Sequence, residues 1–431
     1  MKNVYQLFLF LIVLSSCNLM NNPLDNPTNT GNDAEVVWNS DLAAEINPAT
    51  GRYMPAVDEQ GNIYIIMEDE SMNGYVIQSF SKDGDELWTK YDNTESLHHL
   101  LISYYKNKLF FATDNKMICL NSADGSLRWE YNEPDSLAFF ISKSWAIVND
   151  QIVTTLSYGT ADGSYLFSFD TGSGQLAWTQ KISDDNRVVG FVCASGNQLF
   201  FVNDKVIKYS VTNNGANKNW ESEIPGNSEY SFIVNTATFP AVDSDGNIIF
   251  TIRNYEDYES VYTVVCYDNG GSLKWQYTPD NTGKVIQPNC LMTDADNDVY
   301  LPQNELVKLD KQNGTLLWEA DAPDETLGFG SINHITIGED EKLYVGDSFG
   351  YYILNQSGEI TLNNALPEWN GNNPLTYATL LPNGNVIMLA MGSSDSEVSQ
   401  IYCIKSESGG VERNAWAKWG ANAANTFNSE D

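Results

Sequence analysis

The chain has 431 residues and carries 57 acidic against 23 basic side chains, which gives a formal net charge of −34. Hydrophobic residues make up 42% of the sequence, so the chain has enough apolar side chains for a folded core and is too apolar for a disordered protein. Nucleic-acid binding and electrostatic docking on anionic lipid both need clustered lysine and arginine. The composition therefore excludes nucleic acid as a partner and disfavours electrostatic docking on a membrane.

The N-terminus is typical of an export signal. Lys2 supplies a positive charge, and an unbroken apolar run from Leu7 to Leu14 is followed by Ser15-Ser16-Cys17. This run is shorter than the roughly 20 apolar residues that a membrane-spanning helix needs. Small residues before a cysteine resemble the bacterial lipobox, which implies cleavage before Cys17 and a lipid on its thiol. The alternative is an ordinary signal peptide that happens to contain a cysteine.

We therefore predict a signal peptide at residues 1–16 and a lipidated flexible tether at 17–34, which is rich in Asn, Pro, Thr and Gly. The remainder, 35–431, is predicted to be a single domain. Asn18 stands where aspartate favours inner-membrane retention under enterobacterial rules, so the resemblance implies an outer-membrane lipoprotein that faces the periplasm. The lipid anchor is then its only expected contact with the membrane.

A short motif recurs along the domain, in which a glycine in a polar turn precedes a tryptophan by four residues. The five regular copies are Gly84–Trp88, Gly125–Trp129, Gly174–Trp178, Gly271–Trp275 and Gly314–Trp318. A looser copy runs from Gly215 to Trp220, and Gly358 to Leu362 keeps the spacing without the tryptophan. A tight hairpin needs a residue with positive φ, which glycine supplies at the least steric cost.

A second polar turn precedes each of these motifs and is followed by an apolar residue. These apolar residues are Ile63, Leu109, Ile152, Leu199, Ile248, Val299, Leu343 and Val386. Their successive spacings are 46, 43, 47, 49, 51, 44 and 43 residues. The sequence therefore contains eight repeats of one size, each with signals for four short strands and without helical periodicity.

Four antiparallel strands in a repeat of this length indicate an all-β fold, a β-propeller with eight blades. A single blade cannot bury both of its faces, but blades stacked around an axis bury them against each other. We expect one tryptophan of each blade to lie in the interface with its neighbour, where a large flat side chain buries the most area. The predicted interface residues are Trp38, Trp88, Trp129, Trp178, Trp220, Trp275 and Trp318.

The first tryptophan also predicts how the ring closes. Val36-Val37-Trp38 has the character of a last strand but has no strands before it, and the eighth repeat lacks a regular Gly–Trp ending. The N-terminal strand is therefore predicted to complete the last blade, which removes an exposed sheet edge. The alternative is a seven-bladed ring with an irregular C-terminal tail.

The repeat resembles the pyrroloquinoline-quinone-like (PQQ-like) propeller repeat, whose blades end in Asp-x-x-Thr-Gly-x-x-x-Trp. The best copies are Asp310–Trp318 and Asp170–Trp178, and residues 416–426 are similar to a flanking segment common in such proteins. The resemblance covers residues 35–426 and implies the propeller fold, which hosts both enzymes and scaffolds. Quinone enzymes of this fold hold the cofactor on the axis with calcium, often beside two adjacent cysteines. This chain has no adjacent cysteines, so we expect no cofactor and no enzyme activity.

The remaining cysteines and acidic clusters have simpler interpretations than catalysis or metal binding. Cys119, Cys266 and Cys403 lie at matching places in different repeats, so we expect buried free thiols rather than disulfides. The acidic run from Asp294 to Asp298 has oxygen ligands that suit calcium. It also occupies a repeated hairpin turn, where Asp and Asn are favoured without a metal, so no metal site is predicted.

Long loops between the second and third strands of some repeats carry acidic and tyrosine residues. We call these residues the acidic rim: Glu68, Asp69, Glu70, Tyr255, Glu256, Asp257, Tyr258, Glu259, Asp395 and Glu397. Such loops share one face of a propeller, so the acidic rim is a candidate partner surface. The alternative is that the charges serve solubility alone.

The predicted function is that of a non-catalytic interaction scaffold in the cell envelope with a protein partner. The combination of a lipid anchor with a PQQ-like propeller resembles the outer-membrane barrel-assembly lipoproteins of Gram-negative bacteria, which implies a role in outer-membrane protein assembly. Capture of a glycan or peptide is the alternative function. A PQQ-dependent dehydrogenase ranks third.

Overall fold

In the computed structural model, the described residues form 32 strands and no helix. No segment of this part of the chain is a helix long and apolar enough to cross a membrane. The described residues are 35–44, 54–69, 74–93, 101–113, 116–132, 139–158, 163–184, 190–203, 205–225, 240–256, 259–279, 291–302, 306–320, 334–346, 351–364, 375–390, 399–406, 408–413, 415, 417–418, 421–422, 425–426 and 428–429.

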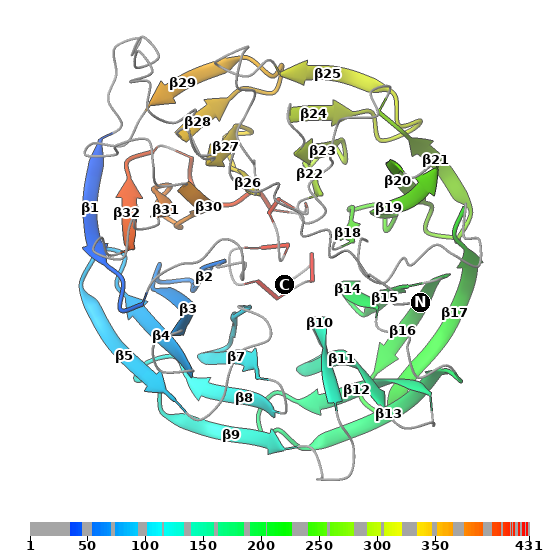
Figure 1. Cartoon of the computed structure of the whole chain (residues 1–431), viewed down its shortest axis with the longest axis horizontal. Coiled ribbons are helices and arrows are strands. Elements are labelled where there is room, and N and C mark those ends of the chain that lie inside the picture. The colour runs from blue at the N-terminus through cyan, green and yellow to red at the C-terminus, as the bar shows by residue number, and fades with distance from the viewer. Residues whose placement is uncertain are drawn as a thin grey trace, which may run out of the picture.

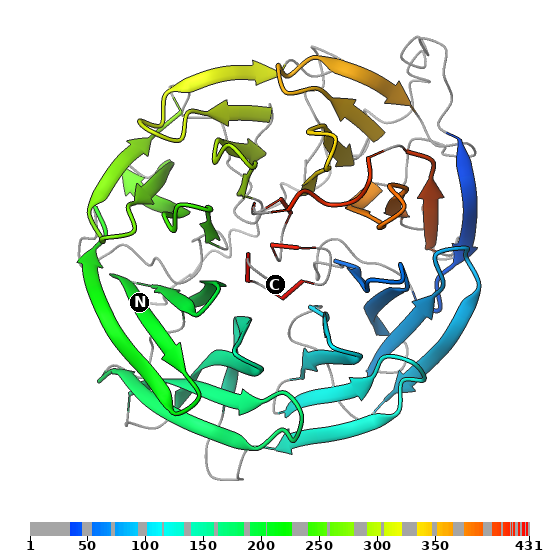
Figure 2. The ribbon, with the colours of Figure 1, turned by 180° about the vertical axis from the view of Figure 1, so that it is seen from behind.

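The strands form eight four-stranded antiparallel sheets arranged as a ring (Figures 1 and 2). Blade 1 contains β2 (Ala56–Val57), β3 (Ile63–Asp69), β4 (Gly74–Phe80) and β5 (Glu86–Asp92). Blade 2 contains β6 (Ser103–Tyr105), β7 (Lys108–Ala112), β8 (Lys116–Asn121) and β9 (Leu127–Asn132). Blade 3 contains β10 (Phe139–Val148), β11 (Gln151–Tyr158), β12 (Ser164–Asp170) and β13 (Leu176–Ser183). Blade 4 contains β14 (Phe191–Ser195), β15 (Gln198–Val202), β16 (Lys205–Thr212) and β17 (Gly215–Glu223).

The second half of the ring repeats this order. Blade 5 contains β18 (Ala241–Val242), β19 (Ile248–Glu256), β20 (Glu259–Tyr267) and β21 (Leu273–Tyr277). Blade 6 contains β22 (Met292–Thr293), β23 (Val299–Pro302), β24 (Leu306–Leu309) and β25 (Leu316–Ala320). Blade 7 contains β26 (His334–Ile337), β27 (Leu343–Gly346), β28 (Tyr351–Leu354) and β29 (Ile360–Asn364). Blade 8 contains β30 (Leu375–Leu380), β31 (Val386–Ala390), β32 (Gln400–Ile404) and β1 (Val36–Asp41).

The eighth blade closes the ring with the N-terminal strand. β1 pairs antiparallel with β32, with Trp38 opposite Cys403 and Asp41 opposite Gln400. The N–H of Lys405 also donates to the Glu35 carbonyl at 2.8 Å. The predicted all-β propeller, its eight blades and its closure by the N-terminal strand are therefore confirmed, and the seven-bladed alternative is wrong.

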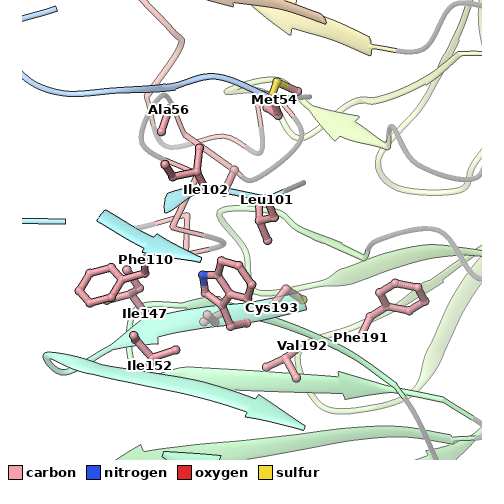
Figure 3. Close-up of a cluster of buried hydrophobic side chains, with 14 of the residues drawn as sticks. Met54, Ala56, Leu101, Ile102, Phe110, Ile147, Ile152, Phe191, Val192 and Cys193 are labelled. Atoms are coloured by element: carbon pink, nitrogen blue, oxygen red, sulfur yellow. The ribbon is translucent and has the colours of Figure 1, made fainter. Parts of the chain in front are cut away.

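The core lies between the blades. The residues of the inner strands are buried, and those of the outer strands are more exposed. All five residues of β14 and of β31 are buried, whereas β9 on the outside is mostly exposed and has Trp129 as its one buried residue. Figure 3 shows part of this core, a cluster of buried apolar side chains that includes Met54, Ile147 and Val192. The inner strands are therefore continuous apolar runs because neighbouring blades cover both of their faces.

The interface between two blades is built from an indole ring on a glycine turn. In six of the interfaces, a Cβ built on the turn glycine would lie 2.4–2.8 Å from the tryptophan ring of the preceding blade, too close for any side chain. These glycines also have φ between 66° and 94°. The pairs are Trp38 with Gly84, Trp88 with Gly125, Trp129 with Gly174, Trp220 with Gly271, Trp275 with Gly314 and Trp318 with Gly358.

A hydrogen bond fixes each of these indoles. The Nε1–H of the tryptophan donates to a backbone carbonyl in the same turn of the next blade, at 2.7–3.2 Å. The acceptors are the carbonyls of Lys82, Ser122, Thr171, Asn269, Lys311 and Gln356, in the order of the tryptophans along the chain. We call the indole, the glycine and this bond the indole latch.

A β-bulge aims each indole at the next blade. In blade 1, Ser79 pairs with Trp88 while the adjacent Phe80 pairs with Glu86, so Leu87 has no partner on β4. The same register shift occurs at the equivalent place in the other seven blades. A bulge bends its strand and redirects the following side chain, which here turns the ring over the neighbouring turn.

Two interfaces depart from the indole latch, each for a local reason. Gly215 in blade 4 has no atom within 4 Å of its built Cβ, so Trp178 does not rest on it. Instead, Trp178 donates to the Gln151 side chain at 3.1 Å, and Gln151 donates to the Asn213 carbonyl of blade 4 at 3.0 Å. Between blades 7 and 8, Leu362 replaces the tryptophan, and no turn joins the third and fourth strands of blade 8, because β32 and β1 are far apart in the sequence.

Two adjacent glycines in blade 5 test the indole latch. Gly271 has φ +88° and lies under the Trp220 ring, whereas a Cβ on Gly270 would meet only the Asp268 Oδ1, at 3.3 Å. We expect Gly271→Ala to lower the free energy of unfolding by about 1–3 kcal/mol, because it adds both backbone strain and overlap with the ring. Gly270→Ala should change it by less than about 0.5 kcal/mol. Urea unfolding of both variants measures this, and equal losses would contradict the indole latch.

Candidate functional site

Several residues singled out by the sequence lie outside the described residues. These are Cys17, Glu70, Asp257, Tyr258, Asp395 and Glu397. Of the remaining acidic rim, Glu68 is half-buried in β3. Asp69, Tyr255, Glu256 and Glu259 lie in β3, β19 and β20, and only their backbone is described.

The backbone places these rim positions at one face of the ring. β3 and β4 pair up to Asp69 opposite Gly74, and β19 and β20 pair up to Glu256 opposite Glu259. Each of these pairs joins the second and third strands of its blade, whereas the glycine turns join the third and fourth. Because the strands are antiparallel, the rim positions lie on the face opposite the glycine turns.

The axis of the ring holds the C-terminal part of the chain. The sequence identifies residues 416–426 only as similar to a flanking segment and does not predict their place. Figures 1 and 2 show the red C-terminal residues at the centre of the ring. We call the described residues between 408 and 429 the axial segment. Its residues Lys418 and Asn425 have no exposed surface, and Asn428 is 2% exposed. No repeat in the sequence signals this placement, because the segment occurs once.

The axial segment is bound mainly to backbone of the inner strands. Asn425 donates to carbonyls of blade 1 and of the segment just before β6, and Asn428 donates to carbonyls of blades 3 and 4. Quinone enzymes with the PQQ-like repeat hold their cofactor on this axis. The described residues there do not fit a quinone, because the axial segment lies on the axis and its side-chain amides bind the inner-strand carbonyls.

Lys418 is the most unusual ionisable group of the axial segment. Its Nζ donates to Asn425 Oδ1 at 2.6 Å within a fully buried site. Burial lowers the pKa of the Lys418 amine to about 7. The amine is therefore largely uncharged above neutral pH, although lysine is ordinarily a cation there.

Glu412 is the second ionisable group of the axial segment with a shifted pKa. Burial, together with the nearby Asp294 carboxylate, raises the pKa of Glu412 to about 7. Its Oε2 has no hydrogen-bond partner among the described residues. The cost of burying this carboxylate favours its protonated form.

Asp294, the first residue of the acidic run, makes its hydrogen bonds and its ion pair within blade 6. Asp294 accepts hydrogen bonds from the Asp298 N–H at 2.9 Å and the Tyr300 hydroxyl at 2.9 Å. The same carboxylate forms a buried ion pair with Lys308 at 3.0 Å. Within the described part of the chain, no three His, Cys, Asp or Glu side chains form a group that could hold a metal ion.

The described cysteines are structural. Cys119, Cys266 and Cys403 are buried, free and opposite the latch tryptophan of their own blades, which confirms the expectation from the repeats. Cys193 in β14 is also free and buried, and Cys290 lies outside the described residues. Burial raises the pKa of the Cys119, Cys266 and Cys403 thiols to about 12, which makes them poor nucleophiles.

The perimeter of the ring is formed by the fourth strands, whose outer edges are unpaired in the described sheets. These strands carry the exposed large apolar side chains, which are Val37, Leu87, Tyr91, Leu127, Leu176, Leu273, Leu316 and Leu317. Open edges with apolar side chains favour association between copies. The net charge of −34 opposes it through mutual repulsion.

The Lys418 amine predicts a specific pH dependence of stability. The unfolded chain keeps this proton up to a pKa of 10.5, whereas the folded protein loses it near 7, so the unfolded state binds more protons between these values. Stability should therefore rise by about 1 kcal/mol from about pH 7 to pH 8 through this group. Lys418→Met should remove that rise. Glu412 acts in the opposite direction in both proteins and cancels in the comparison.

Urea unfolding of the wild-type protein and Lys418→Met at both pH values measures this difference. In this narrow window the buried thiols contribute little, because thiols of the unfolded chain titrate at higher pH. The same pH dependence in the two proteins would show that Lys418 keeps its proton in the fold.

The chain matches a family of known proteins over nearly its whole ring. The family model of the outer membrane protein assembly factor BamB matches residues 30–217 and 234–429. No curated protein sequence gives a significant match.

Two solved structures are similar to the fold. The crystal structure of BamB from Moraxella catarrhalis matches with a TM-score of 0.55 and 17% sequence identity, over 86% of this chain and 99% of that chain. A crystal structure of the mitotic checkpoint complex covers 87% of this chain and 96% of its own at 10% identity, with a TM-score of 0.46. The first match supports the fold, and the family model covers nearly the whole ring. The chain therefore belongs to the family of the outer membrane protein assembly factor BamB.

Proposed function

We propose that the protein is a non-catalytic, lipid-anchored scaffold of the cell envelope that takes part in the assembly of outer-membrane proteins. The observation that carries this proposal is the family match, which extends over both halves of the ring. The lipobox-like Leu14-Ser15-Ser16-Cys17 supports an anchor in the outer membrane with the propeller facing the periplasm.

The geometry of the axis supports a scaffold rather than an enzyme. Enzymes hold their substrates in concave pockets with a few convergent polar groups. At this axis, the polar side chains Asn425 and Asn428 bind the protein's own backbone carbonyls. The buried cysteine thiols have raised pKa values and serve as packing residues. The occupied axis and the unreactive thiols both agree with a function in which partners bind the outer surfaces of the ring.

The acidic rim is the surface that we assign to the protein partner. It combines carboxylates with tyrosines, and tyrosine is enriched in protein interfaces. Carboxylates on one face attract a partner segment that carries lysine or arginine and speed its association. The glycine turns on the opposite face are fixed by the indole latches and leave less freedom for adaptation.

Co-purification from native membranes tests the proposed function. Full-length tagged protein is cross-linked in cells of its own species, and the partners are identified by mass spectrometry. We expect components of the outer-membrane barrel-assembly machinery among the main cross-linked proteins. Cys17→Ser should release the protein from the membrane fraction, because it lacks the thiol that takes the lipid. Reproducible cross-links only to proteins unrelated to outer-membrane assembly would contradict the proposal.

The same experiment locates the partner surface. Glu256→Gln, Asp257→Asn and Glu259→Gln together remove three charges from the acidic rim and should weaken recovery of the partner several-fold. The matched control removes three exposed charges from the opposite face with Asp83→Asn, Asp85→Asn and Glu359→Gln, and should leave recovery unchanged. Equal recovery with both triple variants would show that the rim charges serve solubility.

A further inference from the structure

The chain closes the ring at two places. At the perimeter, β1 pairs with β32 and completes blade 8. At the axis, the axial segment continues from blade 8 and contacts inner strands of other blades. In a propeller each blade otherwise contacts only its two neighbours.

The axial segment is first bound to blade 7. Val411 forms an antiparallel bridge with Gly338, and the Glu412 N–H donates to the Ile337 carbonyl at 2.9 Å. The Ile337 N–H donates to the Ala417 carbonyl at 2.8 Å. The beginning of the axial segment is thus held by backbone bonds at the inner end of blade 7.

Asn425 then connects blades 1 and 2. Its Nδ2 lies 3.2 Å from the carbonyls of Met54 and Pro55, which precede β2, and 3.1 Å from the carbonyl of Ile102, which precedes β6. The Ser103 hydroxyl donates to the Asn425 carbonyl at 2.5 Å. One buried amide therefore satisfies carbonyls of two neighbouring blades.

Asn428 does the same for blades 3 and 4. Its Nδ2 donates to the carbonyls of Ile147 at 2.9 Å and Gly196 at 3.0 Å, and its Oδ1 accepts the Gly196 N–H at 2.8 Å. Beside it, the Ile147 N–H donates to the Thr426 carbonyl at 3.0 Å and the Ser429 N–H to the Ala194 carbonyl at 3.1 Å. This end of the segment continues the hydrogen bonding of β10 and β14.

A buried contact within the segment holds the two parts together. Lys418, which follows the blade 7 anchor, donates to Asn425 Oδ1 at 2.6 Å. The Asn425 amide thus receives a bond from the segment on one side and gives bonds to blades 1 and 2 on the other. The segment links blade 7 to blades 1 to 4 without passing through the interfaces between them.

We propose that the axial segment is an internal strap that holds the inner strands of blades 1 to 4 and blade 7 together, independently of the closure by β1. Buried carbonyls left without donors are costly, so removing the two asparagine amides opens the inner strands. The perimeter closure stays formed, because β1 and β32 pair through their own backbone. The strap also assigns partner binding to the outside of the ring, because the axis is occupied by the chain itself.

Hydrogen exchange of the full-length protein, followed by peptide, tests the strap. Asn425→Ala should speed exchange at least tenfold near Ile102 and Ser103, whereas Asn428→Ala should do so near Ile147 and Gly196. Neither variant should change exchange in β32. Asn383→Ala, in an exposed turn of blade 8, is the control and should leave all four regions as in the wild type. Trp38→Ala, which weakens the perimeter closure, should speed exchange in β1 and β32 and spare the inner strands.

The outcome that overturns the strap is wild-type protection in both asparagine variants, or inner strands in Trp38→Ala that open as far as in those variants. Should a substitution prevent folding, exchange of the wild-type protein in rising, sub-denaturing urea decides the question. The strap requires the inner strands of blades 1 to 4 to open together with residues 425–429. Inner strands that open while these residues stay protected would overturn it.

Discussion

The contact between an indole ring and a glycine turn is the constraint on which the ring depends. A blade of four strands has two apolar faces, and only its neighbours can cover them. The indole supplies a large apolar area and one N–H, and the turn supplies a surface without a Cβ and one carbonyl. Since both partners are needed, the turn glycine of one blade and the tryptophan of the preceding blade form a single structural unit.

The departures from this contact show the same physical requirements. At the interface of blades 3 and 4 the turn glycine Gly215 has no atom within 4 Å of its built Cβ, and Gln151 bridges the indole N–H and the carbonyl of Asn213. At the interface of blades 7 and 8 no turn joins the third and fourth strands of blade 8, because β32 and β1 are far apart in the sequence, and Leu362 stands in place of the tryptophan. Between blades 3 and 4 the indole N–H thus donates to a glutamine that in turn donates to the next blade. Between blades 7 and 8 the indole is absent. A buried N–H without an acceptor does not occur at either place.

The sequence was sufficient to predict the fold because its signals are repeated. The spacing of Ile63 and its seven equivalents gave eight units, and the isolated strand at Trp38 predicted the closure of the ring. The axial segment could not be predicted in this way. Asn425 and Asn428 each donate to carbonyls of two blades that are distant from them in sequence, and such contacts leave no period. The same holds for the buried Lys418, which resembles any surface lysine in the sequence.

The function rests on a different kind of information from the fold. A propeller presents many surfaces, and its architecture does not select one of them. Family membership suggests a role in protein assembly at the outer membrane. Because the chain itself occupies the axis, a partner is expected to bind an outer surface, and the acidic rim is one such surface. The acidic residues of the rim could be recognised by composition alone, because loop length and charge are visible without a structure.

A double-mutant cycle between Trp275 and Gly314 tests the central contact most directly. A Cβ on Gly314 would lie 2.6 Å from the Trp275 ring, so Gly314→Ala should be costly beside tryptophan and much less so beside the smaller Trp275→Leu. We predict that the double variant loses at least about 1 kcal/mol less stability than the sum of the single losses, as expected for residues in direct contact. Single losses that add to the double loss would contradict the dependence of the ring on this contact.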